Sequence, residues 1–188
     1  MSDMIVNYKT IQQRIFNNDE TALAELYQLF YTKLQHFAKA LVHSNEVAEE
    51  IVEDVFVKLW CNRTGITAVN NITVYLYVAV KNSCLNFISR KAKDLISAPF
   101  DFLDIELTEG AATPHDIFIT AEMMQKMNKA IEALPPRCKI IFKLVREDGL
   151  KYKDVAEILN ISVNTIDVQM AIAVKRICTA LGIENRVK

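Results

Sequence analysis

Long stretches without glycine or proline are the feature that most constrains what this chain can fold into. All four glycines and all four prolines stand between apolar segments rather than inside them. Pro135 and Pro136 precede a pattern of helical spacing, whereas Gly149 and Gly182 each follow one. Because proline is tolerated at helix starts and glycine at helix ends, this placement favours an all-α fold.

Apolar residues recur at helical spacing in the first 93 residues. A stripe over residues 23–41 repeats every three or four positions, which is typical of an amphipathic helix, and Asn18 or Asp19 is suited to cap its start. Strand-like alternation is absent over any useful length. We expect helices at about residues 11–16, 23–41, 46–60 and 73–93, with a loop at residues 61–71.

The periodicity stops over residues 94–120, which carry six acidic residues and no lysine or arginine. Helical spacing returns at Ala121 and runs to about Leu181. We therefore predict two helical domains, residues 1–93 and 121–188, joined by an acidic linker at residues 94–120. The formal net charge of −1 gives the whole chain no basic signature, although each predicted domain is slightly basic.

The cysteines and the N-terminus indicate in which compartment of the cell the protein is expected to act. Four cysteines, at positions 61, 84, 138 and 178, lack the spacing of a metal site, and we expect reduced, mostly buried thiols. No signal peptide is recognisable, and no uncharged stretch approaches the roughly 20 apolar residues of a membrane span. We expect a soluble, cytoplasmic protein without a cofactor.

The most informative local pattern covers residues 151–166. A short helix is followed by the turn Asn160-Ile161-Ser162 and then by a second helix. Asparagine tolerates a left-handed backbone, serine caps helices, and Ile161 is expected to plug the core. This pattern predicts a helix-turn-helix, although a helical hairpin without DNA is the plainer alternative. The predicted inward residues are Val155, Ala156 and Leu159 on the first helix and Ile166, Met170, Ala173, Val174 and Ile177 on the second.

If the second helix enters a DNA groove, few of its outer residues are basic, which suits a weak reader acting within a larger complex. Apolar Val168 and Ile172 could contact thymine methyls or pack on a partner protein. The outer positions are Asn164, Asp167, Val168, Ala171, Ile172 and Lys175; Asn164, Thr165 and Lys175 are candidates for phosphates or base edges, and Lys151, Lys153 and Arg176 for the DNA backbone.

The other two long helices carry distinct surfaces. On the helix at residues 46–60, acidic residues beside Trp60 form either a solvated face or a docking surface for a basic partner helix. On the helix at residues 73–93, aromatic, basic and amide residues suit unstacked bases, although Tyr77 and Phe87 could equally be core residues. The docking candidates are Glu49, Glu50, Glu53, Asp54, Val57 and Trp60; the strand-binding candidates are Tyr75, Tyr77, Lys81, Asn82, Asn86, Arg90 and Lys91.

Three segments, in this order, resemble the extracytoplasmic-function (group four) sigma factors, the smallest members of the sigma-70 family. Residues 48–60, AEEIVEDVFVKLW, are similar to the family's polymerase-docking helix. Residues 75–91, YLYVAVKNSCLNFISRK, are similar to its promoter-melting helix. The segment from LPPR at residues 134–137 through the helix-turn-helix resembles its C-terminal domain.

The resemblance implies an alternative sigma factor, not an enzyme. It implies that the acidic helix docks on the β′ clamp helices of RNA polymerase core and that the C-terminal domain reads the −35 element of promoter DNA. It also implies that the loop over residues 61–72 captures a flipped base of the −10 element, with Arg63, Asn70 and Asn71 as candidate contacts. An anti-sigma factor is the further partner that it implies.

This sequence departs from the family pattern at a few positions. Lys151 stands where the family often has a capping serine, and Glu53 where glutamine is common. Val168 and Ile172 stand where polar or basic residues are frequent, which makes strong −35 binding by that helix alone less expected.

Three rival hypotheses remain at this stage. A regulator that binds operators alone as a dimer would explain the helix-turn-helix but leave the acidic helix without a role. A metal enzyme could use His36 and His43 near Glu46 and Glu50, but no nucleophile–base set or phosphate loop accompanies them. A module that binds only other proteins is the third.

Overall fold

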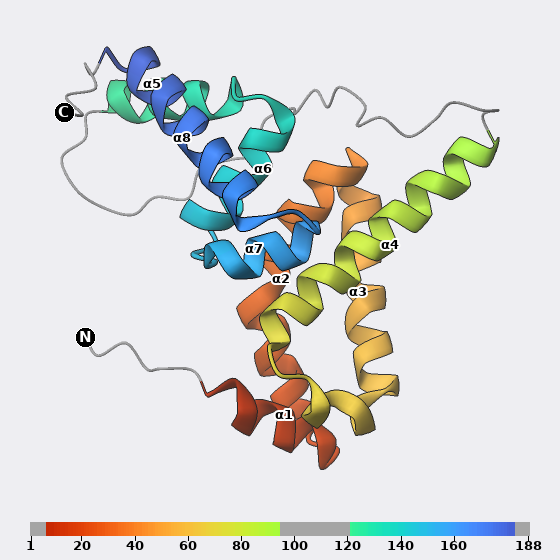
Figure 1. Ribbon diagram of the computed structural model, residues 1–188. Coiled ribbons are helices and arrows are strands. Elements are labelled where there is room, and N and C mark those ends of the chain that lie inside the picture. Colours follow the sequence, from red (N-terminus) through yellow and green to blue (C-terminus); the bar gives the residue numbers. More distant parts are fainter. Residues whose placement is uncertain (1–6, 95–120, 183–188) are drawn as a thin grey trace. The chain divides into compact units, whose positions relative to one another are not determined.

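The computed structural model describes residues 7–94 and 121–182, and within them every regular element is a helix (Figure 1). The chain divides into two compact units. The first contains α1–α4 with a short 3₁₀ helix, η1, and the second contains α5–α8. The all-α class and the two helical parts are therefore confirmed. Residues 95–120 of the predicted linker lie outside the described residues.

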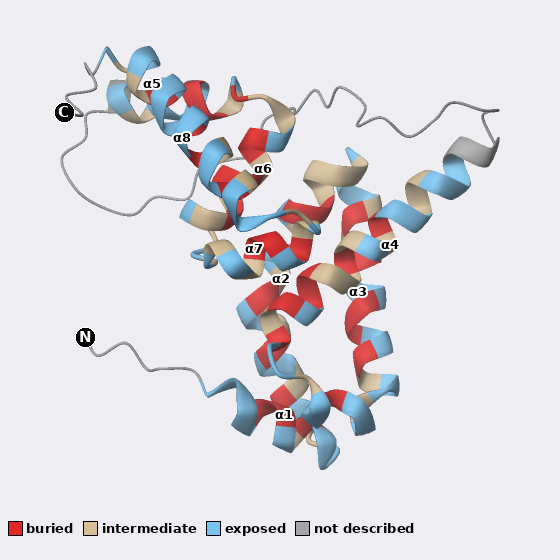
Figure 2. Ribbon diagram, viewed as in Figure 1, coloured by how far each residue is buried: buried red, intermediate tan, exposed pale blue. Residues whose placement is uncertain are grey.

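The first unit is built around a long central helix, α2. It consists of α1 (Tyr8–Phe16), α2 (Glu20–Val42), α3 (Asn45–Cys61), η1 (Arg63–Ala68) and α4 (Ile72–Asp94). Helix α2 packs against α1, α3 and α4, and α1 also packs against η1. Buried positions follow one side of each helix (Figure 2). The predicted stripe on α2 is confirmed, since its buried residues include Leu26, Phe30, Leu34 and Phe37.

Side-chain caps fix where α2 and α3 begin. Asp19 accepts hydrogen bonds from the backbone N–H groups of Thr21 and Ala22, which confirms it as the cap of α2. The Thr21 hydroxyl and the Arg14 guanidinium also hydrogen-bond to this carboxylate, and together they lower the pKa of Asp19 to about 2. Ser44 caps α3 in the same way, through the N–H of Val47.

The second unit comprises α5 (Ala121–Glu132), α6 (Pro136–Arg146), α7 (Tyr152–Leu159) and α8 (Val163–Ala180). Helix α8 packs against the other three. An ion-pair cluster joins α5 to α6, because the ammonium groups of Lys139 and Lys143 each lie 3.1 Å from a carboxylate oxygen of Glu132. Burial opposes ionisation of Glu132, but these two lysines hold its pKa below the ordinary value.

Two inward predictions in this unit are wrong. Leu159 is only half-buried, and its neighbour Ile158 is fully buried instead. Val174 is 36% exposed, because Ala173 and Ile177 already face the core at that level of α8. Ile161, the predicted plug of the turn, is half-buried.

The cysteines are free thiols that differ in exposure. Cys84 and Cys138 are buried, Cys178 is half-buried and Cys61 is exposed, so the prediction of mostly buried thiols holds for only part of the set. Burial raises the pKa of the Cys84 thiol to about 12. Among the described residues, no helix is long and apolar enough to cross a membrane.

Both histidines of the metal-enzyme hypothesis lie on or at the end of α2. His36 is exposed on α2, and His43 ends the same helix in a left-handed conformation. Burial lowers the pKa of His43. Residues 7–94 and 121–182 contain no cluster of three or more histidine, cysteine or acidic side chains suited to holding a metal ion.

Candidate nucleic-acid and protein interfaces

Helices α7 and α8 form the predicted helix-turn-helix. Asn160 ends α7 in the left-handed conformation with φ 55° and ψ 50°, as its side chain permits. The N–H of Ile161 donates to the carbonyl of Ala156 at 3.0 Å, and Ser162 Oγ accepts from the N–H of Thr165 at 3.0 Å. A hydrogen bond therefore closes each end of the turn. Lys151 begins α7 without a side-chain cap, in agreement with its departure from the family pattern.

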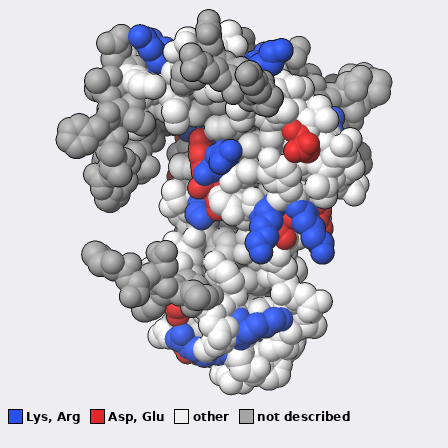
Figure 3. All heavy atoms as spheres, turned by 60° about the vertical axis from the view of Figure 1, so that its left-hand side comes forward, with Lys and Arg blue, Asp and Glu red and all other residues white. Residues whose placement is uncertain are grey.

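Helix α8 presents its predicted outer residues to solvent. Val168 is 49% exposed and Ile172 is 37% exposed, whereas Ile166 and Met170 face the core. Thr165 is half-buried, and the flanking bases Lys151, Lys153 and Arg176 are exposed. On the face that Figure 3 shows, basic and acidic side chains are interspersed. The other exposed residues of the outer set are Asn164, Asp167, Ala171 and Lys175.

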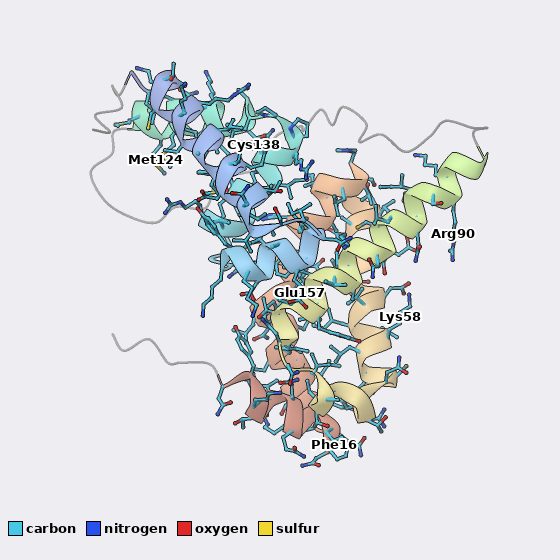
Figure 4. All side chains as sticks on the ribbon, viewed as in Figure 1. Phe16, Lys58, Arg90, Met124, Cys138 and Glu157 are labelled. Atoms are coloured by element: carbon cyan, nitrogen blue, oxygen red, sulfur yellow. The ribbon has the colours of Figure 1, made fainter. Side chains whose placement is uncertain are left out.

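Helix α3 carries the predicted acidic face. Glu50, Glu53 and Asp54 are exposed, whereas Glu49 is half-buried and accepts a hydrogen bond from Gln35 on α2 at 2.9 Å. Asp54 also lies 3.7 Å from Lys58, the next residue along that face, which Figure 4 labels. An exposed pair of this kind contributes little to stability, so these carboxylates are available to a partner.

An exposed valine and a covered tryptophan complete this face. Val57 is 59% exposed, the highest value for a large apolar side chain among the described residues. Trp60 is half-buried, and the guanidinium of Arg63 lies 4.8 Å from its ring centre. Arg63 covers part of the ring by a cation–π contact, so the predicted anchor is only partly open to a partner.

One side of α4 carries four of the predicted strand-binding residues. Tyr75 is 40% exposed and shares a helix face with Asn82 and Asn86. Arg90 continues this face towards the C-terminal end of α4, where Figure 4 labels it. Lys91 is exposed and Lys81 is half-buried, and both lie off this face.

Tyr77 is a correction to the predicted strand-binding set. Its side chain is fully buried, and its ring packs edge-on against Phe37 of α2 with 5.2 Å between centres. A ring enclosed by the core has no free face on which a base could stack, so Tyr77 belongs to the core. Phe87, the other ambiguous aromatic residue, is half-buried.

The segment between α3 and α4, residues 62–71, is ordered by contacts with α1. Ile66 is buried, and the amide of Gln12 donates to the carbonyls of Ile66 and Val69 at 2.7 and 2.9 Å. The ammonium of Lys9 donates to Val69 as well, at 2.9 Å. Gln12 was not among the residues predicted from the sequence. The available signal was a polar residue next to the apolar positions Ile11 and Ile15 of a short helix.

The loop candidates are partly engaged inside the first unit. Arg63 donates from Nε to Asn18 at 2.5 Å and from Nη1 to the carbonyl of Trp60 at 2.9 Å. Asn71 Oδ1 accepts from the N–H of Val74 at 3.2 Å and so caps α4, while Asn70 is exposed. Beside them lies an open pocket of about 470 Å³, lined by Asn7, Tyr8, Lys9, Gln12, Asn70, Asn71 and Ile72.

Comparison with known proteins places both units. The family model described as Sigma-70 region 2 matches residues 26–94, and the one described as Sigma-70, region 4 matches residues 124–177. The first match spans most of α2, η1 and all of α3 and α4, and the second covers most of the four helices of the second unit.

Individual relatives agree with these matches. The chain is 24% identical over 170 residues to the ECF RNA polymerase sigma factor SigW of Bacillus subtilis, covering 84% of this chain and 87% of that protein. It is 22% identical over 172 residues to the ECF RNA polymerase sigma-E factor of Escherichia coli, covering 88% and 89%.

Two solved structures share the fold. One is the sigma factor RpoE in complex with the anti-sigma factor NepR from Bartonella quintana, with a TM-score of 0.59, 19% identity and coverage of 86% of this chain and 98% of that one. The other is CnrH in complex with the cytosolic domain of CnrY, with a TM-score of 0.57, 13% identity and coverage of 94% and 98%.

Proposed function

The chain belongs to the extracytoplasmic-function sigma factors of the sigma-70 family, which direct RNA polymerase to promoters, and we propose which of its residues do so. The observation that carries the proposal is the order of the two units. A region 2 unit with an exposed acidic face precedes a region 4 unit that presents a helix-turn-helix. For the domains we propose the bounds 1–93 and 121–188.

The exposed face of α3 docks on RNA polymerase core. Glu50, Glu53 and Asp54 supply negative charge for a basic partner helix, and Val57 supplies the apolar contact next to it. Glu49 and Trp60 take a smaller part because Gln35 and Arg63 already contact them. The partner that we propose is the pair of β′ clamp helices.

The face of α4 and the preceding loop bind the −10 element. Tyr75 offers a ring for an unstacked base, while Asn82, Asn86 and Arg90 offer hydrogen-bond donors along the same side. Lys81 and Lys91 add positive charge for the strand backbone. Asn70 and Asn71, which line the pocket, contact an extruded base in this proposal, and Arg63 contributes by holding the loop.

Helix α8 reads the −35 element. Asn164 and Thr165 stand at its N-terminal end, the part of a recognition helix that usually reaches the base edges. Val168 and Ile172 suit the methyl groups of thymines, and Lys175 suits a phosphate. Asp167 and Ala171 complete the outer face, with Lys151, Lys153 and Arg176 on the flanking DNA backbone.

Control by an anti-sigma factor is also part of the proposal. RpoE, which shares the fold, was solved with the anti-sigma factor NepR, and CnrH was solved with the cytosolic domain of CnrY. We propose that this chain has an anti-sigma partner and acts in the cytoplasm, where RNA polymerase works.

The rival hypothesis of a stand-alone dimeric regulator does not account for the first unit, because that unit matches Sigma-70 region 2.

Transcription in vitro tests the assignment. Purified core polymerase, with and without the chain, is given a library of DNA randomised around the −35 and −10 positions. Transcripts that require the chain and share one sequence at each position are the expected result. Binding of operator DNA by the chain alone, with no effect on core polymerase, would reject the proposal.

A further inference from the structure

Helix α1 holds the loop that precedes α4 through one buried side chain. Gln12 is only 2% exposed, and its Nε2 donates both of its hydrogens, to Ile66 at 2.7 Å and to Val69 at 2.9 Å. Lys9 adds a third bond to the loop, at Val69. A buried amide is costly unless it is paired, and the bonds of Gln12 go to loop carbonyls rather than to its own helix.

These bonds fix the turn that comes directly before the loop residues lining the pocket. Val69 ends η1, and its N–H donates back to the carbonyl of Ile66, so Gln12 clamps the two carbonyls of one tight turn. Asn70 and Asn71 follow directly and line the pocket of about 470 Å³. Asn7, Tyr8 and Lys9 of the α1 region line it as well.

We propose that α1 is part of the −10 reading site and that Gln12 is a positioning residue for base capture, an inference that rests on the proposed function. Gln12 holds the turn so that Asn70 and Asn71 are already in place when a base leaves the duplex. A preorganised loop loses less conformational freedom on binding, and its polar groups favour one base over another more strongly. The ligand is one extruded nucleobase of the −10 element.

Base preference distinguishes positioning from simple structural support. The test substitutes Gln12→Met, which keeps the length of the side chain and removes both donors, with Gln13→Met as matched control on the exposed side of α1. Each full-length variant, bound to core polymerase, transcribes a library randomised across the −10 region. Reading one base typically changes affinity about 5- to 150-fold.

We expect Gln12→Met to lower the preference at one −10 position by about tenfold, with the −35 preference and the Gln13→Met profile unchanged. An unchanged −10 profile would overturn the inference. So would an equal loss at every position that follows the loss of thermal stability, because that pattern marks a purely structural role.

A second variant decides the case in which Gln12→Met does not fold. Lys9→Met removes one loop contact from an exposed position, and we expect about a twofold to threefold loss of preference at the same −10 position. If Lys9→Met leaves the −10 preference unchanged, the inference is overturned. If the unaltered chain gives core polymerase no −10 preference, the proposed function itself fails, and that result is distinct from either outcome.

Discussion

At the scale of single residues, Lys175 is the one base among the predicted outer positions of α8, and it is exposed. A lysine that neutralises one phosphate releases about one counterion, so Lys175→Ala should reduce the slope of log affinity against log salt by about 0.9. Fluorescence anisotropy with −35 DNA at several salt concentrations measures that slope for the polymerase-bound chain. Lys129→Ala on α5 is the control, and an unaltered slope in Lys175→Ala would mean that Lys175 does not meet a phosphate.

Glu132 links stability of the second unit to pH. Lys139 and Lys143 lower its pKa, so the carboxylate contributes stability above its unfolded pKa of about 4.5, and this contribution is lost as pH falls through the lower folded value. Glu132→Gln leaves the buried Lys139 ammonium without its counter-charge and should cost about 2 kcal/mol at pH 7. Urea denaturation checks both points. The difference between the variant and the unaltered chain should shrink as pH drops below about 4.5, and a constant difference would contradict the assignment.

Single residues also show where sequence reasoning was limited. The exposure of Val168 and Ile172 and the caps at Asp19 and Ser162 follow from local spacing, and the structure bears them out. Tyr77 could not be assigned in that way, because only the packing of Phe37 against it decides between core and surface. Local spacing marks Gln12 as a polar residue beside apolar positions but does not give its partners, which lie 54 and 57 residues further along the chain.

At the scale of elements, the acidic face of α3 gives a test that leaves the fold intact. Asp54 is exposed and pairs only loosely with Lys58, so Asp54→Lys should change stability by less than about 1 kcal/mol. The same change places a positive charge against a basic partner and should weaken core binding by about 10- to 100-fold at low salt. Asp54→Asn should give an intermediate loss, and both losses should fall as salt rises. Equal affinity in all three proteins would remove Asp54 from the docking surface.

Element positions were largely predictable, and the exception has a physical reason. The predicted helices agree with α1–α4 because apolar periodicity and caps are local signals. The segment over residues 61–71 was predicted as a loop, yet it contains the 3₁₀ helix η1. Its geometry depends on Ile66 packing towards α1 and on donors from that distant helix, and no local pattern in the sequence encodes those contacts.

At the scale of the whole molecule, the two compact units share one chain, so a second unit with low DNA affinity of its own should still bind promoter DNA with high apparent affinity. The outer face of α8 offers a single lysine, and only Lys151, Lys153 and Arg176 flank it, so the second unit alone should bind DNA weakly. Once the first unit holds polymerase, the connecting chain keeps the second unit at a local concentration of about millimolar, which can raise apparent affinity by 10²–10⁴-fold. Promoter strength then depends on the covalent connection as much as on base contacts.

Dividing the chain tests this coupling. Residues 121–188 alone should bind −35 DNA at least about 100-fold more weakly than the full chain bound to core polymerase does. Residues 1–94 with core should transcribe poorly from promoters that need a −35 element, and adding residues 121–188 as a separate fragment at micromolar concentration should not restore activity. Circular dichroism shows whether each fragment is helical before its activity is compared. Full recovery by the separate fragment would mean that region 4 finds its place through its own contacts, with no contribution from the linkage.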